Sequence, residues 1–148
     1  VAVLNAAEVV RRVQPAALKA PAAASTRVVV ADDSLTTRSA MKALLEMAGY
    51  QVTAAADGEE AFQLVRDQGA ALVVSDVQMP RLDGLGLARR LKADARLRAI
   101  PVILVTSLDA PEDRAAGLAA GADGYLVKRE VERGKLLELV RQLLPGGA

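Results

Sequence analysis

The sequence lacks several residue types on which common protein chemistries depend. Its 148 residues include no cysteine and no histidine. This excludes disulfides, thiolate-bound metal centres and every mechanism that uses an imidazole as base or ligand. Aromatic residues make up only 2% of the chain, which argues against the stacking surfaces that bind single-stranded nucleic acid. The chemistry available to the protein therefore rests on carboxylates, hydroxyls and amines.

Charge and hydropathy narrow the class of protein further. There are 19 Lys and Arg against 18 Asp and Glu, a net charge of +1, so no overall field attracts nucleic acid or an anionic membrane. We expect no nucleic-acid partner and no membrane insertion. Hydrophobic residues form 52% of the chain, without a long apolar run or a signal peptide. This composition is typical of a piece of a cytoplasmic protein with one compact domain.

The composition changes along the chain and divides it into four parts. Residues 15–25 are rich in Ala and Pro and read as a linker. Residues 1–14 could form a short strand and a short helix, which are too little for a core, so we expect them to be the tail of a preceding domain. Residues 26–144 form the main domain, and 145–148 form a C-terminal tail.

From residue 26 onward, short apolar runs alternate with longer segments of helical spacing. Four of the runs are continuously apolar, which is typical of strands buried on both faces of a parallel sheet. We therefore predict a doubly wound (βα)5 sheet of the α/β class. The expected strands are residues 27–31, 51–56, 71–75, 101–105 and 124–127.

The segments between the strands carry helix start and stop signals. Ser34, Asp57 and Asp83 stand where N-cap residues are expected. Gly49 and Gly69 follow the first two helical segments and are typical of helix ends. These signals predict where three of the five helices begin.

The last two helical segments differ in composition. The segment 111–120 contains only one large apolar residue, Leu118, and includes Gly117. This predicts a weakly packed, mobile helix. The final helix is expected to run through residues 130–144, with one apolar face directed inward.

Reactive side chains follow four of the five expected strands. Asp32 and Asp33 follow the first strand, Asp76 the third, Thr106 the fourth and Lys128 the fifth. Each alone has an ordinary structural role, such as a helix cap, a turn residue or a solvated lysine. Because the functional crevice of an open parallel sheet lies beyond the carboxyl ends of its strands, their common placement favours one site.

The chemistry of such a site follows from its residue types. Clustered carboxylates repel one another, and a bound cation relieves the repulsion. An all-oxygen site without His or Cys selects a hard cation, and Mg²⁺ suits a small crevice that keeps bound water. Asp76 would act as an ionised nucleophile toward a phosphoryl group, with Lys128 and Thr106 contacting that group. Glycine-rich triphosphate or dinucleotide loops are absent.

Four segments resemble the motifs of the response-regulator receiver domain of the CheY type. They are VVVADDS at 28–34, VVSDVQMPRLDG at 73–84, PVILVTS at 101–107 and GADGYLVK at 121–128. The resemblance covers about residues 26–144. It implies a flavodoxin-like fold with strand order 2-1-3-4-5.

The resemblance also implies roles for individual residues around a metal ion. Asp76 is similar to the phosphoacceptor. Asp33, Asp76 and the backbone carbonyl of Gln78 resemble the direct Mg²⁺ ligands. Asp32 would act mainly through a water molecule.

Further roles concern the phosphoryl group and the response to it. Lys128 and Thr106 resemble the residues that contact the phosphoryl group, and Tyr125 resembles the switch aromatic. The family usually has a cis proline where this chain has Arg129. Because a non-proline cis bond costs about 2.5 to 4 kcal/mol, this loop is expected to be trans or strained.

The first residues carry a second resemblance. VAVLNAAEVVRR at 1–12 is similar to the end of the CheW-like domain that closes a chemotaxis histidine kinase of the CheA type. With SLTTR at 34–38, it implies the receiver of a hybrid CheA–CheY kinase of the gliding-motility Frz type. The phosphodonor would be a phosphohistidine on a phosphotransfer domain, and the receiver would regulate the attached or partner kinase.

Two other functions fit parts of the pattern. A pseudo-receiver would keep the fold and act only as a docking or dimerisation module, which the departure at Arg129 favours and the intact acids oppose. A phosphatase with an aspartate nucleophile would need a second aspartate two residues beyond Asp76. Gln78 stands at that position.

Overall fold

The computed structural model describes residues 26–107, 111–132 and 134–144. The strand and helix expected within 1–14, the linker at 15–25 and the tail at 145–148 lie outside these residues. The strands are β1 (Arg27–Ala31), β2 (Gln51–Ala55), β3 (Leu72–Asp76), β4 (Val102–Thr106) and β5 (Gly124–Val127). The helices are α2 (Leu35–Met47), α3 (Gly58–Gln68), α4 (Gly84–Ala93), α5 (Pro111–Ala119), α6 (Lys128–Glu132) and α7 (Lys135–Leu143).

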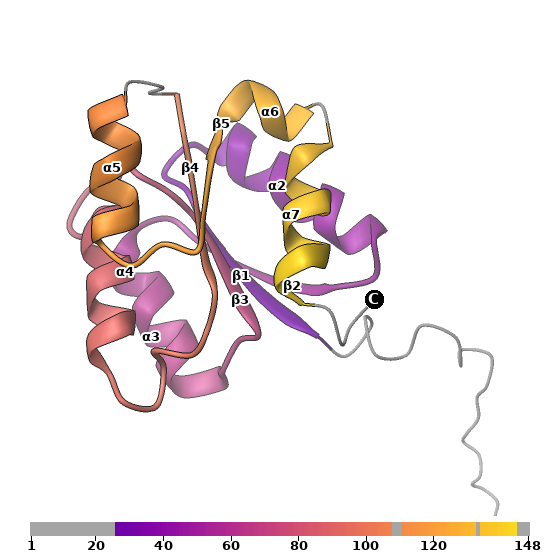
Figure 1. Cartoon of the computed structure of the whole chain (residues 1–148). Helices are drawn as coiled ribbons and strands as arrows, with labels where there is room; N and C mark the ends of the chain where they lie inside the picture. The colour runs from indigo at the N-terminus through magenta and orange to yellow at the C-terminus, as the bar shows by residue number, and fades with distance from the viewer. Residues whose placement is uncertain (1–25, 108–110, 133, 145–148) are drawn as a thin grey trace, which may run out of the picture.

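The strands form one parallel sheet in the order β2-β1-β3-β4-β5. Helices α3, α4 and α5 cover one face, and α2, α6 and α7 lie on the other (Figure 1). Alternate residues of the central strands feed two separate apolar cores, one under each layer of helices. The predicted fold class and strand order are confirmed. Strands β3 and β4 are buried on both faces, as their largely apolar sequences predict.

The predicted helix starts agree with the structure. Ser34, Asp57 and Asp83 are the N-cap residues of α2, α3 and α4. In each case a side-chain oxygen accepts the backbone N–H three residues further on, which satisfies a donor that has no partner within the helix. The strands β3 and β4 each lie one residue later than predicted. Asp76 and Thr106 are consequently the last residues of their strands.

The final helix differs from the prediction. Instead of one helix over residues 130–144, the structure has α6 and α7, separated at Gly134, whose φ is 84°. This left-handed conformation breaks an α-helix and is accessible to glycine at little cost. As expected, Leu136 and Val140 of α7 are buried in the core.

Helix α5 packs through its smallest residue. Gly117 is its only buried residue among those described, while Leu118 is 57% exposed. A Cβ atom at Gly117 would lie 2.8 Å from the ring of Tyr125. The helix therefore approaches β5 closely but buries little apolar surface, which agrees with the predicted weak packing.

A test of the fold concerns Gly84, the first residue of α4. Gly84→Ala would normally stabilise a helix by up to about 1 kcal/mol. Here the new Cβ would lie 2.2 Å from the carbonyl oxygen of Asp76, and backbone cannot move away as a side chain can. We expect a net loss of about 1–3 kcal/mol in the free energy of unfolding, measured with urea.

Gly86→Ala is the matched control for that substitution. Its Cβ would meet the end of the Leu82 side chain, which can rotate away. The urea midpoint of Gly86→Ala should therefore stay well above that of Gly84→Ala. Equal midpoints would contradict the backbone collision at Gly84.

Candidate functional site

The register of the sheet brings two acidic residues together. β1 and β3 pair Ala31 with Ser75, so the residues that follow, Asp32 and Asp76, lie next to each other at the carboxyl edge. Both side chains are removed from solvent, with residue exposures of 0% for Asp32 and 5% for Asp76. Carboxylates at this depth lose most of their hydration, which makes the ionised pair costly without a counter-charge.

The other predicted site residues on β4 and after β5 reach the same edge. Thr106 ends β4, pairs with Val127 of β5 and is fully buried. Lys128 follows Val127 directly and is the first residue of α6. The carboxyl ends of β1, β3, β4 and β5 therefore contribute to one region, as the sequence predicts.

Three carboxylates form a compact cluster at this edge. Asp32, Asp33 and Asp76 each offer an oxygen, and these oxygens all lie within 4.8 Å of one another. Asp32 Oδ1 accepts the backbone N–H of Ser34 at 2.8 Å. Its other oxygen, Oδ2, is buried and accepts no hydrogen bond from the described residues.

The surroundings of Asp76 disfavour its charged form. Burial is the main cause and the negative charge of Asp32 adds to it, so the pKa of Asp76 is raised above its ordinary value. The ammonium of Lys128 and the backbone N–H groups of Gln78 and Val77 act in the opposite direction without overcoming the rise. A carboxylate held in this way is stabilised by any added positive charge.

Lys128 supplies the one ammonium within ion-pair distance of Asp32 and Asp76 among the described residues. Its Nζ lies 3.5 Å from Asp32 Oδ2 and 3.6 Å from Asp76 Oδ2. The lysine side chain is 33% exposed, so it faces both the buried acids and solvent. No described peptide bond is cis, and the bond between Lys128 and Arg129 is therefore trans.

Gln78 and Tyr125, the two remaining predicted site residues, differ in their exposure to solvent. Gln78 is exposed, two residues beyond Asp76 in the β3–α4 loop. Tyr125 is 7% exposed and packs in the core beneath α5. The guanidinium carbon of Arg114 lies 4.9 Å from the centre of its ring, and Arg114 also donates a hydrogen bond to the Tyr125 carbonyl. The aromatic ring therefore lies inward in this structure.

An ion pair that the sequence did not predict holds the β3–α4 loop. Arg81 has a φ of 67°, and its guanidinium pairs with Asp57, the buried N-cap of α3. The backbone N–H of Glu60 and the Arg81 guanidinium lower the pKa of Asp57. The N–H of Gly58 also donates to the carbonyl of Leu82. The loop after Asp76 is thus fastened to the start of α3.

The donor set fits a divalent cation with oxygen ligands. Three carboxylates lie close together, and Lys128 is the one ammonium within ion-pair distance of Asp32 and Asp76 among the described residues. The cluster therefore keeps negative charge that this single ammonium does not balance, and the buried Asp32 Oδ2 accepts no hydrogen bond from those residues. Hard oxygen ligands and an exposed member, Asp33, suit Mg²⁺ with some of its water retained. Asp32, Asp33 and Asp76 would hold such an ion.

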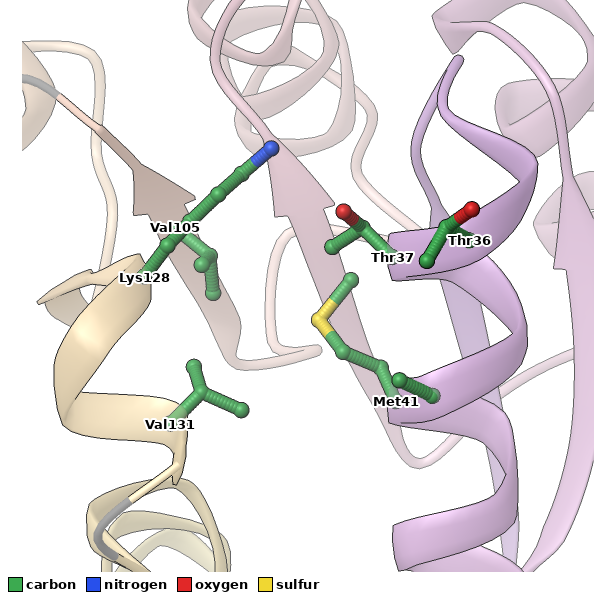
Figure 2. A pocket seen from close by; sticks show the side chains of 7 residues that line it. Thr36, Thr37, Met41, Val105, Lys128 and Val131 are labelled. Carbon is green, nitrogen blue, oxygen red and sulfur yellow. The ribbon is translucent and has the colours of Figure 1, made fainter.

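A pocket of about 190 Å³ lies beside the cluster, between α2 and α6. Lys128 and Val131 on one wall face Thr37 and Met41 on the other (Figure 2). Lys128 borders both this pocket and the acidic cluster. The pocket is lined by Thr36, Thr37, Ala40, Met41, Val105, Lys128 and Val131.

Comparison with known proteins identifies the family. Residues 28–141 match the model of the response regulator receiver domain, and the chain belongs to this family. Members bind Mg²⁺ at an acidic pocket, and the aspartate cluster is the corresponding acidic group here. They act with histidine kinases or phosphotransfer proteins in two-component signalling.

Two curated relatives illustrate the range of proteins that contain this domain. The chain is 48% identical over 122 residues to a gliding motility regulatory protein of Myxococcus xanthus, which covers 82% of this chain and 16% of that protein. It is 41% identical over 102 residues to the response regulator MprA of Mycolicibacterium vanbaalenii, covering 69% of this chain and 43% of the relative. The chain thus spans less than half of each of these proteins.

Solved structures agree with the family and the fold. The signal receiver domain of a histidine kinase from Syntrophus aciditrophicus is 37% identical with a TM-score of 0.74, covering 82% of this chain and 92% of that one. The chemotaxis protein CheY4 of Vibrio cholerae is 31% identical with a TM-score of 0.73, covering 80% and 98%. Among the described residues, no helix has the length and hydropathy to span a membrane.

Proposed function

We propose that this receiver domain accepts a phosphoryl group on Asp76 from a phosphohistidine, with Mg²⁺ as cofactor. The observation that carries the proposal is the placement of Lys128 Nζ 3.5 and 3.6 Å from the buried Asp32 and Asp76 carboxylates. The Lys128 ammonium faces solvent as well as the buried acids, so an incoming phosphoryl group can reach it. This placement fits a role in phosphoryl transfer better than a purely structural ion pair does.

In the proposed site each acidic residue has a distinct role. Asp33, Asp76 and the backbone carbonyl of Gln78 would bind the metal directly, and Asp32 would bind it mainly through water. When bound, Mg²⁺ supplies positive charge that screens the carboxylates from one another and from the phosphoryl oxygens. The backbone N–H groups of Val77 and Gln78 favour the ionised form of the Asp76 carboxylate.

The transfer step needs no general base. An ionised Asp76 oxygen forms a bond to phosphorus, the bond from phosphorus to the donor nitrogen breaks, and the leaving imidazole keeps the electron pair. Lys128 and Thr106 would contact the phosphoryl oxygens and hold the group in line. Because this chain contains no histidine, the donor must belong to a different domain or protein.

The response to phosphorylation would involve Thr106 and Tyr125. Thr106 would move toward the phosphoryl group, and the ring of Tyr125, which packs against Gly117 of α5, would respond to that movement. Helix α5 contributes a single buried residue among those described. An element with so little buried surface is suited to shifting between two arrangements.

For the larger context, we propose the C-terminal receiver of a cytoplasmic hybrid CheA–CheY kinase of the gliding-motility Frz type. The 48% identity to a gliding motility regulatory protein, of which this domain covers 16%, supports it. In this proposal residues 26–144 are the receiver, 1–14 end a CheW-like domain, 15–25 link the two, and 145–148 form a tail. The receiver would regulate the attached or partner kinase and would bind no nucleic acid.

Acetyl phosphate provides a direct test of the phosphoacceptor. With Mg²⁺ present, intact-mass measurement should detect one added phosphoryl group, and peptide mapping should place it on Asp76. Omitting Mg²⁺ or adding a chelator should prevent the addition. A chain that binds Mg²⁺ but gains no phosphoryl group would contradict the proposal and favour the docking-module function.

A further inference from the structure

A glutamate of α6 caps the helix start that carries the lysine of the site. Lys128 is the first residue of α6. Glu130, two residues later, accepts the backbone N–H of Val127 through Oε1 at 2.8 Å. Val127 precedes the helix and has no side-chain hydrogen-bonding atom. The third helical residue therefore supplies the acceptor, as in one half of a capping box.

The direction of helical side chains connects this cap to the site. In an α-helix each Cα–Cβ bond tilts toward the N-terminus. Lys128, at the first position of α6, is therefore directed back toward the carboxyl edge of the sheet, where its Nζ lies 3.5 Å from Asp32 and 3.6 Å from Asp76. A rotation of the first turn of α6 would move the ammonium away from both carboxylates.

Helix α6 depends on its cap more than a long helix would. It has five residues, and isolated helices much shorter than about 12 residues are marginal in water. It is followed by Gly134, which separates it from α7. It also begins with a cation, Lys128, which the positive end of the helix dipole disfavours, whereas the carboxylate of Glu130 in the same turn is favoured.

We infer that Glu130 is a positioning residue for phosphoryl transfer. Its hydrogen bond to the N–H of Val127 holds the first turn of α6 so that the Lys128 ammonium meets the phosphoryl group. The hydrogen bond from the Val127 N–H to Glu130 holds Lys128 in this position while the peptide bond between Lys128 and Arg129 is trans. The inference rests on the proposed role of Lys128.

The test uses the full chain with acetyl phosphate as donor at saturating Mg²⁺. Glu130→Ala should lower the phosphorylation rate about five- to tenfold, as expected for the loss of a helix cap. Its affinity for Mg²⁺, measured by calorimetry, should stay unchanged. Glu130→Gln should keep the rate within about twofold, because glutamine offers the same acceptor. Glu112→Ala, which removes an exposed acid from the first turn of α5, is the matched control and should leave the rate unchanged.

A double substitution separates positioning from a general structural role. In a Lys128→Met background, Glu130→Ala should cause no further slowing. A wild-type rate in folded Glu130→Ala, an equal loss in Glu130→Gln, or the same slowing in the Lys128→Met background would each overturn the inference. Circular dichroism establishes that the variants fold. Failure of the wild-type chain to take up a phosphoryl group would instead overturn the proposed function itself.

Discussion

Replacing Asp76 with asparagine is expected to abolish phosphoryl uptake and, in metal-free buffer at neutral pH, to stabilise the fold. The loss of uptake follows because an amide is not a nucleophile for this transfer. The gain in stability follows because burial and the negative charge of Asp32 raise the pKa of Asp76. At an effective dielectric constant of about 20, two like charges about 4 Å apart repel by about 4 kcal/mol, and the Lys128 ammonium offsets part of this repulsion. We therefore expect a gain on the order of 1 kcal/mol.

The sign of the pH dependence follows from the direction of the shift. A folded-state pKa above the unfolded value means that the native protein binds the Asp76 proton more tightly. The cost of ionisation is absent below the unfolded pKa, grows as the pH rises and is complete above the folded pKa. The stability difference between Asp76→Asn and wild type should therefore widen as the pH rises through this window.

Addition of Mg²⁺ and a second variant, Asp33→Asn, serve as controls for the stability of Asp76→Asn. Mg²⁺ should raise the thermal midpoint of the wild type more than that of Asp76→Asn, since the variant lacks one ligand carboxylate. Asp33→Asn, at the exposed member of the cluster, should change metal-free stability less than Asp76→Asn does. Uptake of a phosphoryl group by another residue of Asp76→Asn would refute Asp76 as the phosphoacceptor. A loss of metal-free stability in Asp76→Asn would refute the electrostatic cost of its buried charge.

Lys128→Met should slow phosphorylation by about 10²- to 10³-fold while strengthening Mg²⁺ binding. The slowing is typical of removing one preorganised group that stabilises charge in a transition state. The change in metal affinity has the opposite sign because the ammonium, 3.5 and 3.6 Å from the two buried carboxylates, competes with a cation for their charge. Methionine keeps an apolar side chain beside Val131 and Met41 in the neighbouring pocket.

The control for this substitution is a lysine outside the site. Lys135 lies on α7 with its side chain 52% exposed, so Lys135→Met removes the same charge without touching the cluster. It should change neither the rate nor the metal affinity by more than about twofold, since surface substitutions have small effects. Similar kinetics for Lys128→Met and Lys135→Met would contradict a role of Lys128 in the transfer.

Local sequence patterns predicted the strands and most helix ends, because those features depend on neighbouring residues. The continuous apolar runs required burial on both faces, and Ser34, Asp57 and Asp83 cap helices through backbone groups three residues away. The last helix was predicted incorrectly because its apolar spacing continues across Gly134. A glycine within a helical pattern is a recognisable signal for such a break.

Contacts between distant segments had no comparable signal. Arg81 and Asp57 are separated by 24 residues, and neither position alone indicates that the other is its partner. The inward placement of Tyr125 likewise depends on how closely α5 approaches β5 at Gly117. Such pairs depend on the path of the whole chain, and one sequence shows that path only indirectly.

The absence of cysteine and histidine, the strand pattern and the strand-end residues were enough to determine the fold class and the chemistry to expect. They also placed Asp32, Asp76, Thr106 and Lys128 at one edge, because parallel strands end on the same side. Only the tertiary structure decided that, among the described residues, Asp32 keeps a buried oxygen without a hydrogen bond and one ammonium lies near two carboxylates. Those properties arise from register and burial, which set distances and hydration that a linear pattern does not contain.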